Sequence, residues 1–366
     1  MAYVAVKGGK IAIEQSILRL KQERLRFGEA APVKMIENSM RLLVDQVMSE
    51  GSIYCPSLAA LAIKQAEGSM EEAVFLLRAY RSALPRRYYS TRVESADMQI
   101  ERRISAAFKD IPGGQILGTS YDYTHRLLDF DLLEESDEQI QKILQQFKEA
   151  DTDARIAPET MRMPKVTDYL RSQGFIDPTE PDDSEPKDAT KETLIFPCPR
   201  SMRLQILTRG MTQAVTALGY ASLRGYGVAH PTVCELRVGR LPITIADPVN
   251  GDDEENEYVI GEIKVTEVES LIPVTRQSED GRKQNRFEIG YGIAVGQNET
   301  KTIAMSILDQ CLMHPDNSFA TSDEEFVLYH VDSIEATGFI SHLKLPHYVT
   351  FQAKLNSARK VREENA

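Results

Sequence analysis

Two histidines near the carboxyl end of the chain, His342 and His347, lie five residues apart in GFISHLKLPHYVTF, with Pro346 between them. Positions i and i+5 are about 140° apart around a helix, and an odd separation puts side chains on opposite faces of a strand. A proline favours a bend just before it, and a bend could bring both imidazoles to one metal ion. The alternative is two unrelated surface histidines, which is the simpler interpretation of a bare pair.

The stretch KDIPGGQILGTSYDYTHRLLDF, residues 109–130, combines three glycines with several ionisable side chains in an expected loop. Loops of this composition are places where functional sites tend to be built. Asp122 or Asp129 could stabilise positive charge that develops on a sugar, as carboxylates do in glycosyl transfer. His125 could act as a general acid toward a leaving group. Alternatively, these side chains only pack the loop.

Several basic residues could bind a polyanionic ligand such as a triphosphate. Arg78 and Arg81 are three apart on one expected helix, and Arg103 and Lys109 lie on the next. Lys7 precedes Gly8-Gly9 after a short expected strand, an arrangement that resembles a minimal phosphate cradle but lacks the spacing of a P-loop. For the arginines and Lys109 the alternative is a set of solvated faces and salt bridges, and the sequence supports both interpretations equally. For Lys7-Gly8-Gly9 the alternative is a plain strand-to-helix turn, which is the simpler interpretation.

Composition sets limits on the class of protein. The chain has 366 residues, 42% of them hydrophobic and 27% charged, which is typical of a soluble globular protein. Its net charge of −12 disfavours non-specific binding to nucleic acid, and no apolar run is long enough to span a membrane. The four cysteines lie far apart without a CxxC spacing, so we expect reduced thiols of a cytoplasmic protein rather than a zinc knuckle or an iron–sulfur site.

The elements that must position these residues indicate an α+β fold in three regions. Residues 1–132 are expected to be mainly helical, with helices near 11–26, 36–47, 70–84 and 95–110. Residues 133–192 are polar and acidic, and we interpret them as a linker or variable insertion. Residues 193–366 should contain strands at 241–247, 257–268 and 290–296, followed by helices at 300–313 and 349–364.

Several long blocks of this sequence resemble the PhnI family, a subunit of the bacterial carbon–phosphorus lyase system for phosphonate use. The matching blocks are YVAVKGG, AVFLLRAYR, ERRISAAFKDIPGGQILGTSYDYTHRLLDF, DEEFVLYH and GFISHLKLPHYVTFQAKL. A shorter match is RGYG followed, after Val228, by AHP. The resemblance covers nearly the whole chain except residues 133–192.

The resemblance implies ligands and partners. In the family a pair matching His342 and His347 binds zinc, and Mg²⁺ would accompany the nucleotide. Lys344, between the two histidines, could hold a phosphate or phosphonate oxygen near the metal. The expected partners are PhnG, PhnH and PhnJ in a core complex, with PhnK and PhnL. Cleavage of the C–P bond is assigned to PhnJ, because this chain lacks the clustered cysteines that an iron–sulfur protein needs.

The resemblance also implies a reaction. An alkylphosphonate displaces adenine from the anomeric carbon of ATP and gives ribose 1-phosphonate 5-triphosphate, so the protein is expected to be a transferase subunit. Alone, it is expected to act as a purine nucleotide nucleosidase, with water as the attacking group. The alternative is a non-catalytic scaffold that organises the complex and donates its histidines to a metal site shared with PhnJ, since two histidines are too few for four-coordinate zinc.

Overall fold

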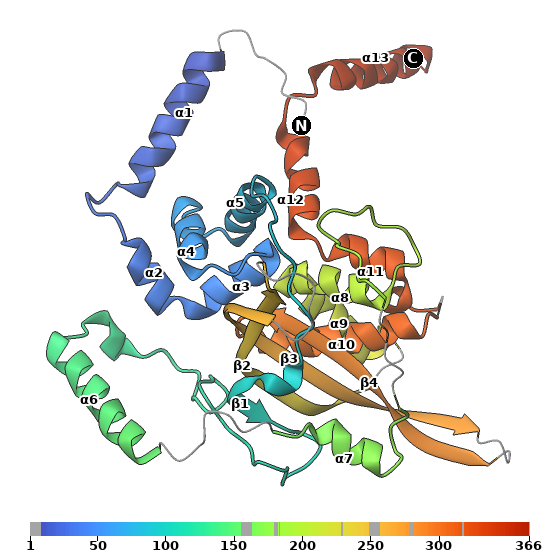
Figure 1. The fold of residues 1–366 in the computed structure, drawn as a ribbon. Coiled ribbons are helices and arrows are strands. Elements are labelled where there is room, and N and C mark those ends of the chain that lie inside the picture. The colour runs from blue at the N-terminus through green and yellow to red at the C-terminus, as the bar shows by residue number, and fades with distance from the viewer. Residues whose placement is uncertain are drawn as a thin grey trace.

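A computed structural model describes residues 9–154, 163–178, 182, 184–227, 230–248, 257–277, 282–316 and 318–365 of the chain. It confirms the α+β class: helices predominate before residue 99, and a four-stranded antiparallel sheet lies mostly in the C-terminal half. Figure 1 shows the sheet at the centre, with the N-terminal helices on one side and the C-terminal helices above it.

The N-terminal region consists of five helices, of which α2 to α5 share a hydrophobic core. Ser69 accepts a hydrogen bond from the backbone N–H of Glu72, so it caps α5 as its sequence predicts. The helix expected near 36–47 is instead two helices, because the backbone departs from helical geometry at Met40. The helices are α1 (Gly9–Arg24), α2 (Val33–Ser39), α3 (Arg41–Gly51), α4 (Pro56–Gln65) and α5 (Met70–Ser82).

The sheet has the strand order β1-β2-β3-β4 with every neighbouring pair antiparallel. The strands predicted at 241–247, 257–268 and 290–296 are confirmed, although each observed strand is longer than the run that predicted it. The strands are β1 (Gln99–Ile104), β2 (Thr232–Ala246), β3 (Glu257–Gln277) and β4 (Lys283–Val295).

The helix expected over residues 95–110 is wrong. Residues Gln99–Ile104 form edge strand β1, which pairs with β2, and Arg103 also pairs with Ile116 on its other side. The register shifts between Ile100 and Arg102. Arg102 and Arg103, which point to opposite faces of the strand, are both buried. The backbone partners of β1 on β2 lie more than 130 residues away, so the local helical pattern does not reveal them.

Helix α10 (Glu299–Met313) packs closely against one face of the sheet and was predicted at 300–313. Its approach depends on two glycines of β4. A Cβ atom on Gly290 would lie 2.1 Å from the Ser306 carbonyl oxygen, and one on Gly292 would lie 2.2 Å from that of Thr302. The Gly-Tyr-Gly sequence therefore marks a close contact between helix and strand. Helices α8 (Arg200–Arg209) and α9 (Thr212–Ala221) lie beside α10 (Figure 1).

The segment 133–192 contains α6 (Asp137–Ala154) and α7 (Val166–Ser172). Helix α7 buries Val166 and Leu170 against Cys234 and Leu271 of the sheet, so this part belongs to the packed body. Part of the segment lies outside the described residues, and the division into three regions remains a prediction.

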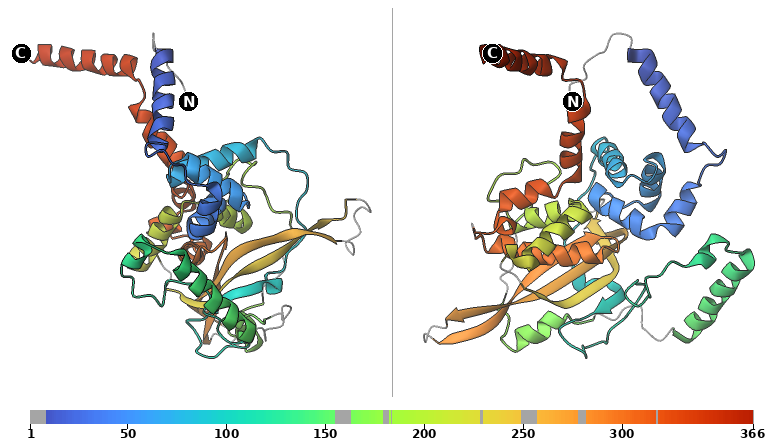
Figure 2. Two further views of the ribbon diagram at one scale, coloured as in Figure 1. Left: turned by 90° about the vertical axis from the view of Figure 1, so that its left-hand side faces the viewer. Right: turned by 180° about the vertical axis from the view of Figure 1, so that it is seen from behind.

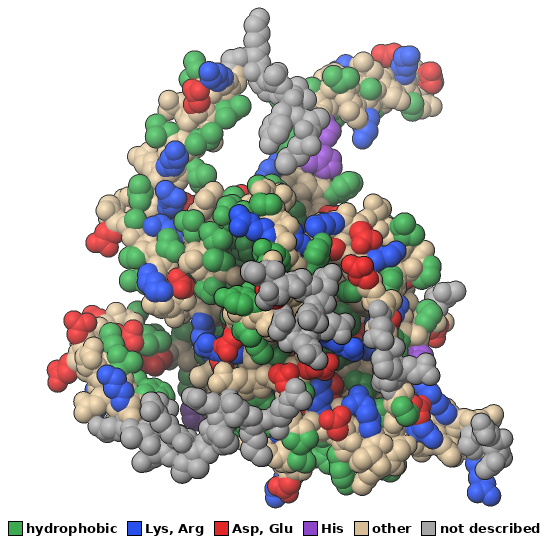
Figure 3. All heavy atoms as spheres, in the orientation of Figure 1, with side chains coloured by type: hydrophobic (Ala, Val, Ile, Leu, Met, Phe, Trp, Pro, Cys, Tyr) green, Lys and Arg blue, Asp and Glu red, His purple; other side chains and the backbone are tan. Residues whose placement is uncertain are grey.

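The C-terminal part continues through α11 (Glu324–His330), α12 (Ser333–Ser341), a short 3-10 helix (His342–Lys344) and α13 (Tyr348–Glu364). The terminal helix expected at 349–364 is thus confirmed. Helices α1 and α13 extend away from the body in both views of Figure 2 and have no buried residues. Hydrophobic side chains line α1 at the surface (Figure 3), among them Ile11, Ile13, Ile17, Leu18 and Leu20.

Candidate functional site

A cavity of about 280 Å³ lies at the N-terminal end of α10. Four segments that are far apart in the chain line it: the start of α3, the loop 120–126, the start of α9 and residues 297–301. The first N–H groups of any helix lack partners within the helix and carry partial positive charge, so this end of α10 favours an anion. The ionisable side chains that line it are Arg41, Tyr121, Asp122, Arg126, Glu299 and Lys301.

Asp122 lies in this cavity with its side chain about half exposed. Its carboxylate accepts a hydrogen bond from Arg102 Nη2 at 2.6 Å, and Arg126 Nη2 lies 4.0 Å away. Arg102 is 1% exposed and also pairs with Glu299 at 3.0 Å. The buried arginine therefore fixes the position of the carboxylate while one side of it stays open to the cavity. This geometry suits a carboxylate that stabilises a cation on a bound ligand.

The cavity has cations that the sequence gives little reason to group. Arg41 Nη1 donates to Gln297 Oε1 at 2.6 Å, and Arg126 Nε donates to the carbonyl of Tyr121 at 3.1 Å. Lys301 is fully buried and donates to the Thr208 carbonyl and the Ser49 hydroxyl, both neutral groups. Burial lowers the pKa of Lys301 to about 8. Asn298, directly before α10, could have indicated the start of a helix. No local signal in the sequence indicates that this helix start lies beside the loop at 120–126.

The other candidates from residues 109–130 lie outside the cavity. His125 is exposed and does not contribute to its lining. Lys109 is also exposed. Of these three candidates, only Asp122 lines the cavity. The general-acid role of His125 and the ligand contact of Lys109 stay predictions.

His342 and His347 come together at the junction of α12 and α13, with ring centroids 5.6 Å apart. The bend expected at the proline is present, since Leu345 is extended (φ −74°, ψ 159°). Nδ1 of His342 bonds the Phe339 carbonyl, and Nδ1 of His347 bonds the Leu345 carbonyl at 2.6 Å. With each Nδ1–H donated to the backbone, each Nε2 keeps a free lone pair, which is the form that binds a metal.

The histidine pair fits a metal ion in part. Both side chains are accessible, and the neutral imidazole is a good zinc ligand. No group of three or more histidine, cysteine, aspartate or glutamate side chains is placed for a metal within the described ranges. Further ligands would have to come from water, substrate or another chain. Lys344 is exposed in the 3-10 helix that follows His342.

Arg78 has a structural role in this fold. Its Nη1 donates to both carboxylate oxygens of Asp332 at 2.6 and 2.9 Å, Nε donates to the Glu50 carbonyl, and Nη2 donates to the Arg209 carbonyl. These bonds tie α5 to α3, α8 and the start of α12. Arg81, one turn further along α5, lies in a separate cleft with Arg86 and Lys191. The predicted triphosphate contacts of both arginines stay predictions.

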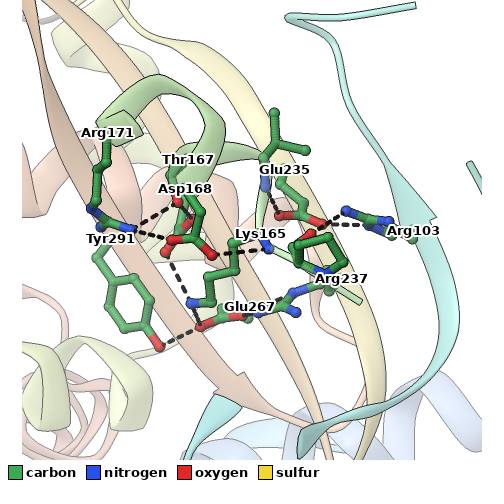
Figure 4. A network of polar contacts seen from close by, with 12 residues as sticks. Arg103, Lys165, Thr167, Asp168, Arg171, Glu235, Arg237, Glu267 and Tyr291 are labelled. Atoms are coloured by element: carbon green, nitrogen blue, oxygen red, sulfur yellow. Dashed lines mark hydrogen bonds and ion pairs between the residues drawn. The ribbon is translucent and has the colours of Figure 1, made fainter. Parts of the chain in front are cut away.

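Arg103 is completely buried in a polar network between the sheet and the segment at 163–171 (Figure 4). Its Nε donates to Glu235 at 2.5 Å, and its two Nη groups donate to the carbonyls of Pro112 and Pro164. Arg237 pairs with Glu267 in the same network. The guanidinium group of Arg103 is therefore fully engaged within the protein, and its predicted contact with a triphosphate stays untested.

The buried part of this network pairs three cations, Arg103, Lys165 and Arg237, with three carboxylates, Glu235, Glu267 and Glu269, which explains how it tolerates burial. Lys165 bridges Glu267 and Glu269 at 2.9 and 3.0 Å. Burial alone would raise the pKa of Glu267, but Arg237 and Lys165 outweigh it and hold that pKa at about 2. Burial, reinforced by Glu267, raises the pKa of Tyr291 well above its ordinary value, so its hydroxyl stays a donor to that carboxylate.

Lys7 lies outside the described residues, together with the expected strand before it. Within the described part of the chain, no helix combines the length and the hydropathy needed to cross a bilayer.

Comparison with known proteins identifies the class to which this fold and these sites belong. A family described as bacterial phosphonate metabolism protein matches residues 2–365. The chain belongs to this family, PhnI.

Three curated relatives align with almost the whole chain. It is 42% identical to a putative C-P lyase subunit protein, HtxH, of Stutzerimonas stutzeri, with 100% of this chain and 97% of the relative covered. It is 41% identical to the alpha-D-ribose 1-methylphosphonate 5-triphosphate synthase subunit PhnI of Rhizobium meliloti (99% and 95% covered). It is 42% identical to the subunit of the same name from Escherichia coli (99% and 99% covered). The resemblance stated from the sequence blocks is thereby confirmed.

Proposed function

We propose that this protein is a catalytic subunit of a ribose 1-phosphonate 5-triphosphate synthase in phosphonate use. One observation carries the proposal: two relatives named as subunits of alpha-D-ribose 1-methylphosphonate 5-triphosphate synthase align with 99% of the chain at 41–42% identity. A phosphonate oxygen attacks the anomeric carbon of ATP, the bond from that carbon to adenine breaks, and adenine leaves. When the protein acts alone, water takes the place of the phosphonate, and the activity is that of a purine nucleotide nucleosidase.

The cavity at the start of α10 supplies groups that suit this reaction. Displacement at an anomeric carbon passes through an oxocarbenium-like state, which the Asp122 carboxylate would stabilise from its fixed position beside Arg102. Arg41, Arg126 and the first turn of α10 would hold phosphate groups of the nucleotide, which carries Mg²⁺. His125, a few residues along the same loop, would protonate the leaving adenine once the loop closes on substrate.

The histidine pair would hold zinc through the two Nε2 atoms. Zinc bound there supplies a Lewis acid that polarises phosphonate or phosphate oxygens. Lys344, in the same turn, would add a positive charge for the same oxygens. The remaining ligands are proposed to come from solvent, substrate or PhnJ, and a ligand from PhnJ would put the pair at a contact with that partner.

The proposed assembly contains PhnG, PhnH and PhnJ, with PhnK and PhnL as further partners. The exposed apolar side chains of α1 suit such contacts, because a lone soluble chain gains nothing from leaving them in water.

The test is chromatography of the purified protein after incubation with ATP. Free adenine should appear and should depend on Asp122, so the Asp122→Asn variant should release it much more slowly. Absence of adenine from the protein alone and from every combination with the partner subunits would refute the proposal.

A second function is favoured by one specific observation: the histidine pair has no third ligand within the described ranges. The protein would then be a scaffold that organises the complex and lends two ligands to a metal site completed by PhnJ. In that case the His342→Ala variant would stop turnover by the assembled complex, and Asp122→Asn would leave it unchanged. The two variants compared in the same complex separate the two functions.

A further inference from the structure

A second cleft, of about 390 Å³, lies where α5 ends and faces residues 190–191. Arg81, Arg86 and Lys191 line it, together with the polar side chain of Thr190. It is separate from the cavity at the start of α10, with which it shares no lining residue. Three cations around one cleft call for an explanation in a protein whose net charge is −12.

The charges near this cleft are unbalanced. Four guanidinium groups lie close enough here to repel one another. Only two carboxylates act on Arg81 and Arg209 to offset this repulsion. The network of Figure 4 differs, because each of its buried cations, Arg103, Lys165 and Arg237, pairs with a carboxylate, as does the more exposed Arg171. The arginines near the cleft are Arg78, Arg81, Arg86 and Arg209, and the carboxylates are Asp188 and Asp332.

Both carboxylates are engaged by other groups, and Asp188 attracts Arg81 only from beyond ion-pair distance. Asp332 forms its bidentate pair with Arg78. Asp188 lies 3.5 Å from Arg86 Nη2 and accepts hydrogen bonds from the backbone and hydroxyl of Thr190. For the Arg81 guanidinium, the described residues offer neither a hydrogen bond nor an ion pair at close range. Its charge is left for a ligand.

The protonation of these groups reports the same imbalance. Burial, followed by repulsion from Arg86, lowers the pKa of Arg81. Burial, followed by repulsion from Arg78, lowers the pKa of Arg209 to about 10. Partly buried like charges destabilise a fold unless an anion joins them. The arginines therefore carry an energetic cost that a bound anion would remove.

The remaining cations of the cleft are held in place by Tyr89. Lys191 Nζ donates to the Tyr89 hydroxyl at 2.9 Å, and the Arg86 guanidinium lies 4.9 Å from the centre of its ring. Restricting these flexible side chains before a ligand arrives lowers the entropic cost of binding. The cleft is thus organised for a compact anion rather than for a large apolar ligand.

We propose that this arginine cleft binds a tetrahedral dianion, a phosphate or phosphonate group, with Arg81 as its principal ligand. A guanidinium group presents paired N–H donors that match two oxygens of such an anion. The dianion could be the free co-substrate or a terminal phosphate of the nucleotide, which share this chemistry. Binding here does not require the proposed reaction, since it involves none of the groups of the α10 cavity.

The test is titration of the full-length protein with inorganic phosphate in a calorimeter, at constant ionic strength set with chloride. Phosphate should bind the wild type and raise its thermal midpoint. Arg81→Gln should weaken binding at least tenfold and should be as stable as the wild type or more so without phosphate, because it removes a repulsive charge. Arg81→Lys keeps the charge without the paired donors and should bind with intermediate affinity.

The matched control is Arg87→Gln, which removes an exposed positive charge six residues away on the chain and outside the cleft. It should bind phosphate as the wild type does. Equal weakening by both glutamine variants, or no phosphate binding by the folded wild type, would overturn the proposal. Competition then identifies the source: displacement of phosphate by methylphosphonate but not by ATP indicates the free co-substrate, and displacement by ATP indicates the nucleotide.

Discussion

Replacing Asp122 by asparagine tests the role of the cavity at the start of α10. The substitution removes a charge and keeps the shape, and the amide oxygen can still accept the bond from Arg102. A full charge about 4 Å from a developing cation contributes roughly 4 kcal/mol at an effective dielectric constant near 20. Arg102 Nη2, 2.6 Å from the carboxylate, neutralises part of this charge. If about half of the interaction energy remains, the contribution is ~2 kcal/mol, which corresponds to about 30-fold in rate.

The assay is the initial rate of adenine release at saturating ATP. Asp122→Asn should lower kcat by about 30-fold and change KM little, because the carboxylate acts mainly on the transition state. The control is Asp131→Asn, an exposed aspartate from the same stretch that does not line the cavity. A kcat within about threefold of wild type for Asp122→Asn, or an equal loss for Asp131→Asn, would refute the assigned role.

The remaining predictions concern the metal and the stability of the fold. Alanine at His342 or His347 should abolish zinc binding, measured by elemental analysis, and wild-type zinc affinity should fall in acid, because only the neutral imidazole binds a metal. Glu267→Gln leaves the buried Arg237 without its paired carboxylate and leaves Lys165 with Glu269 alone, and it should cost about 3–5 kcal/mol in urea unfolding. Because the folded pKa of Glu267 is about 2, below its ordinary 4.5, its stabilisation is complete above about pH 4.5 and is lost as the pH falls toward 2; the variant should lack this dependence. Gly292→Ala should destabilise by about 1–3 kcal/mol because its Cβ would meet the α10 backbone, whereas Gly338→Ala, in open space on α12, should be neutral or slightly stabilising. A stable Gly292→Ala protein would contradict the close helix–sheet contact.

The elements with a clear local pattern could be predicted from the sequence. The β-branched runs at 257–268 and 290–296 form strands, and the residues at 300–313 form α10. Their composition and spacing are local signals that can be recognised without knowing the distant partners. β1 could not be predicted in this way. Its backbone hydrogen bonds go to β2, and only the assembled sheet provides them.

The same distinction applies to the candidate site. The composition of the loop suggested Asp122 or Asp129, and the structure places Asp122 in the lining of the cavity. The proline indicated only that the two histidines could meet, and the family resemblance favoured that interpretation. The residues around Asp122 could not be predicted, because Glu299 and Lys301 come from a helix start almost 180 residues further along. A sequence also does not show whether an arginine is buried in an ion pair, as Arg103 is with Glu235, or faces a ligand.

The most direct test of the proposed reaction is to mix the purified protein with PhnG, PhnH and PhnL, ATP and methylphosphonate, and to follow the products by phosphorus NMR and chromatography. Ribose 1-methylphosphonate 5-triphosphate should accumulate in step with free adenine, and the Asp122→Asn protein should form both about 30-fold more slowly. If the phosphonate signal stays unchanged and adenine is absent while the wild-type complex is intact, the protein does not catalyse this displacement.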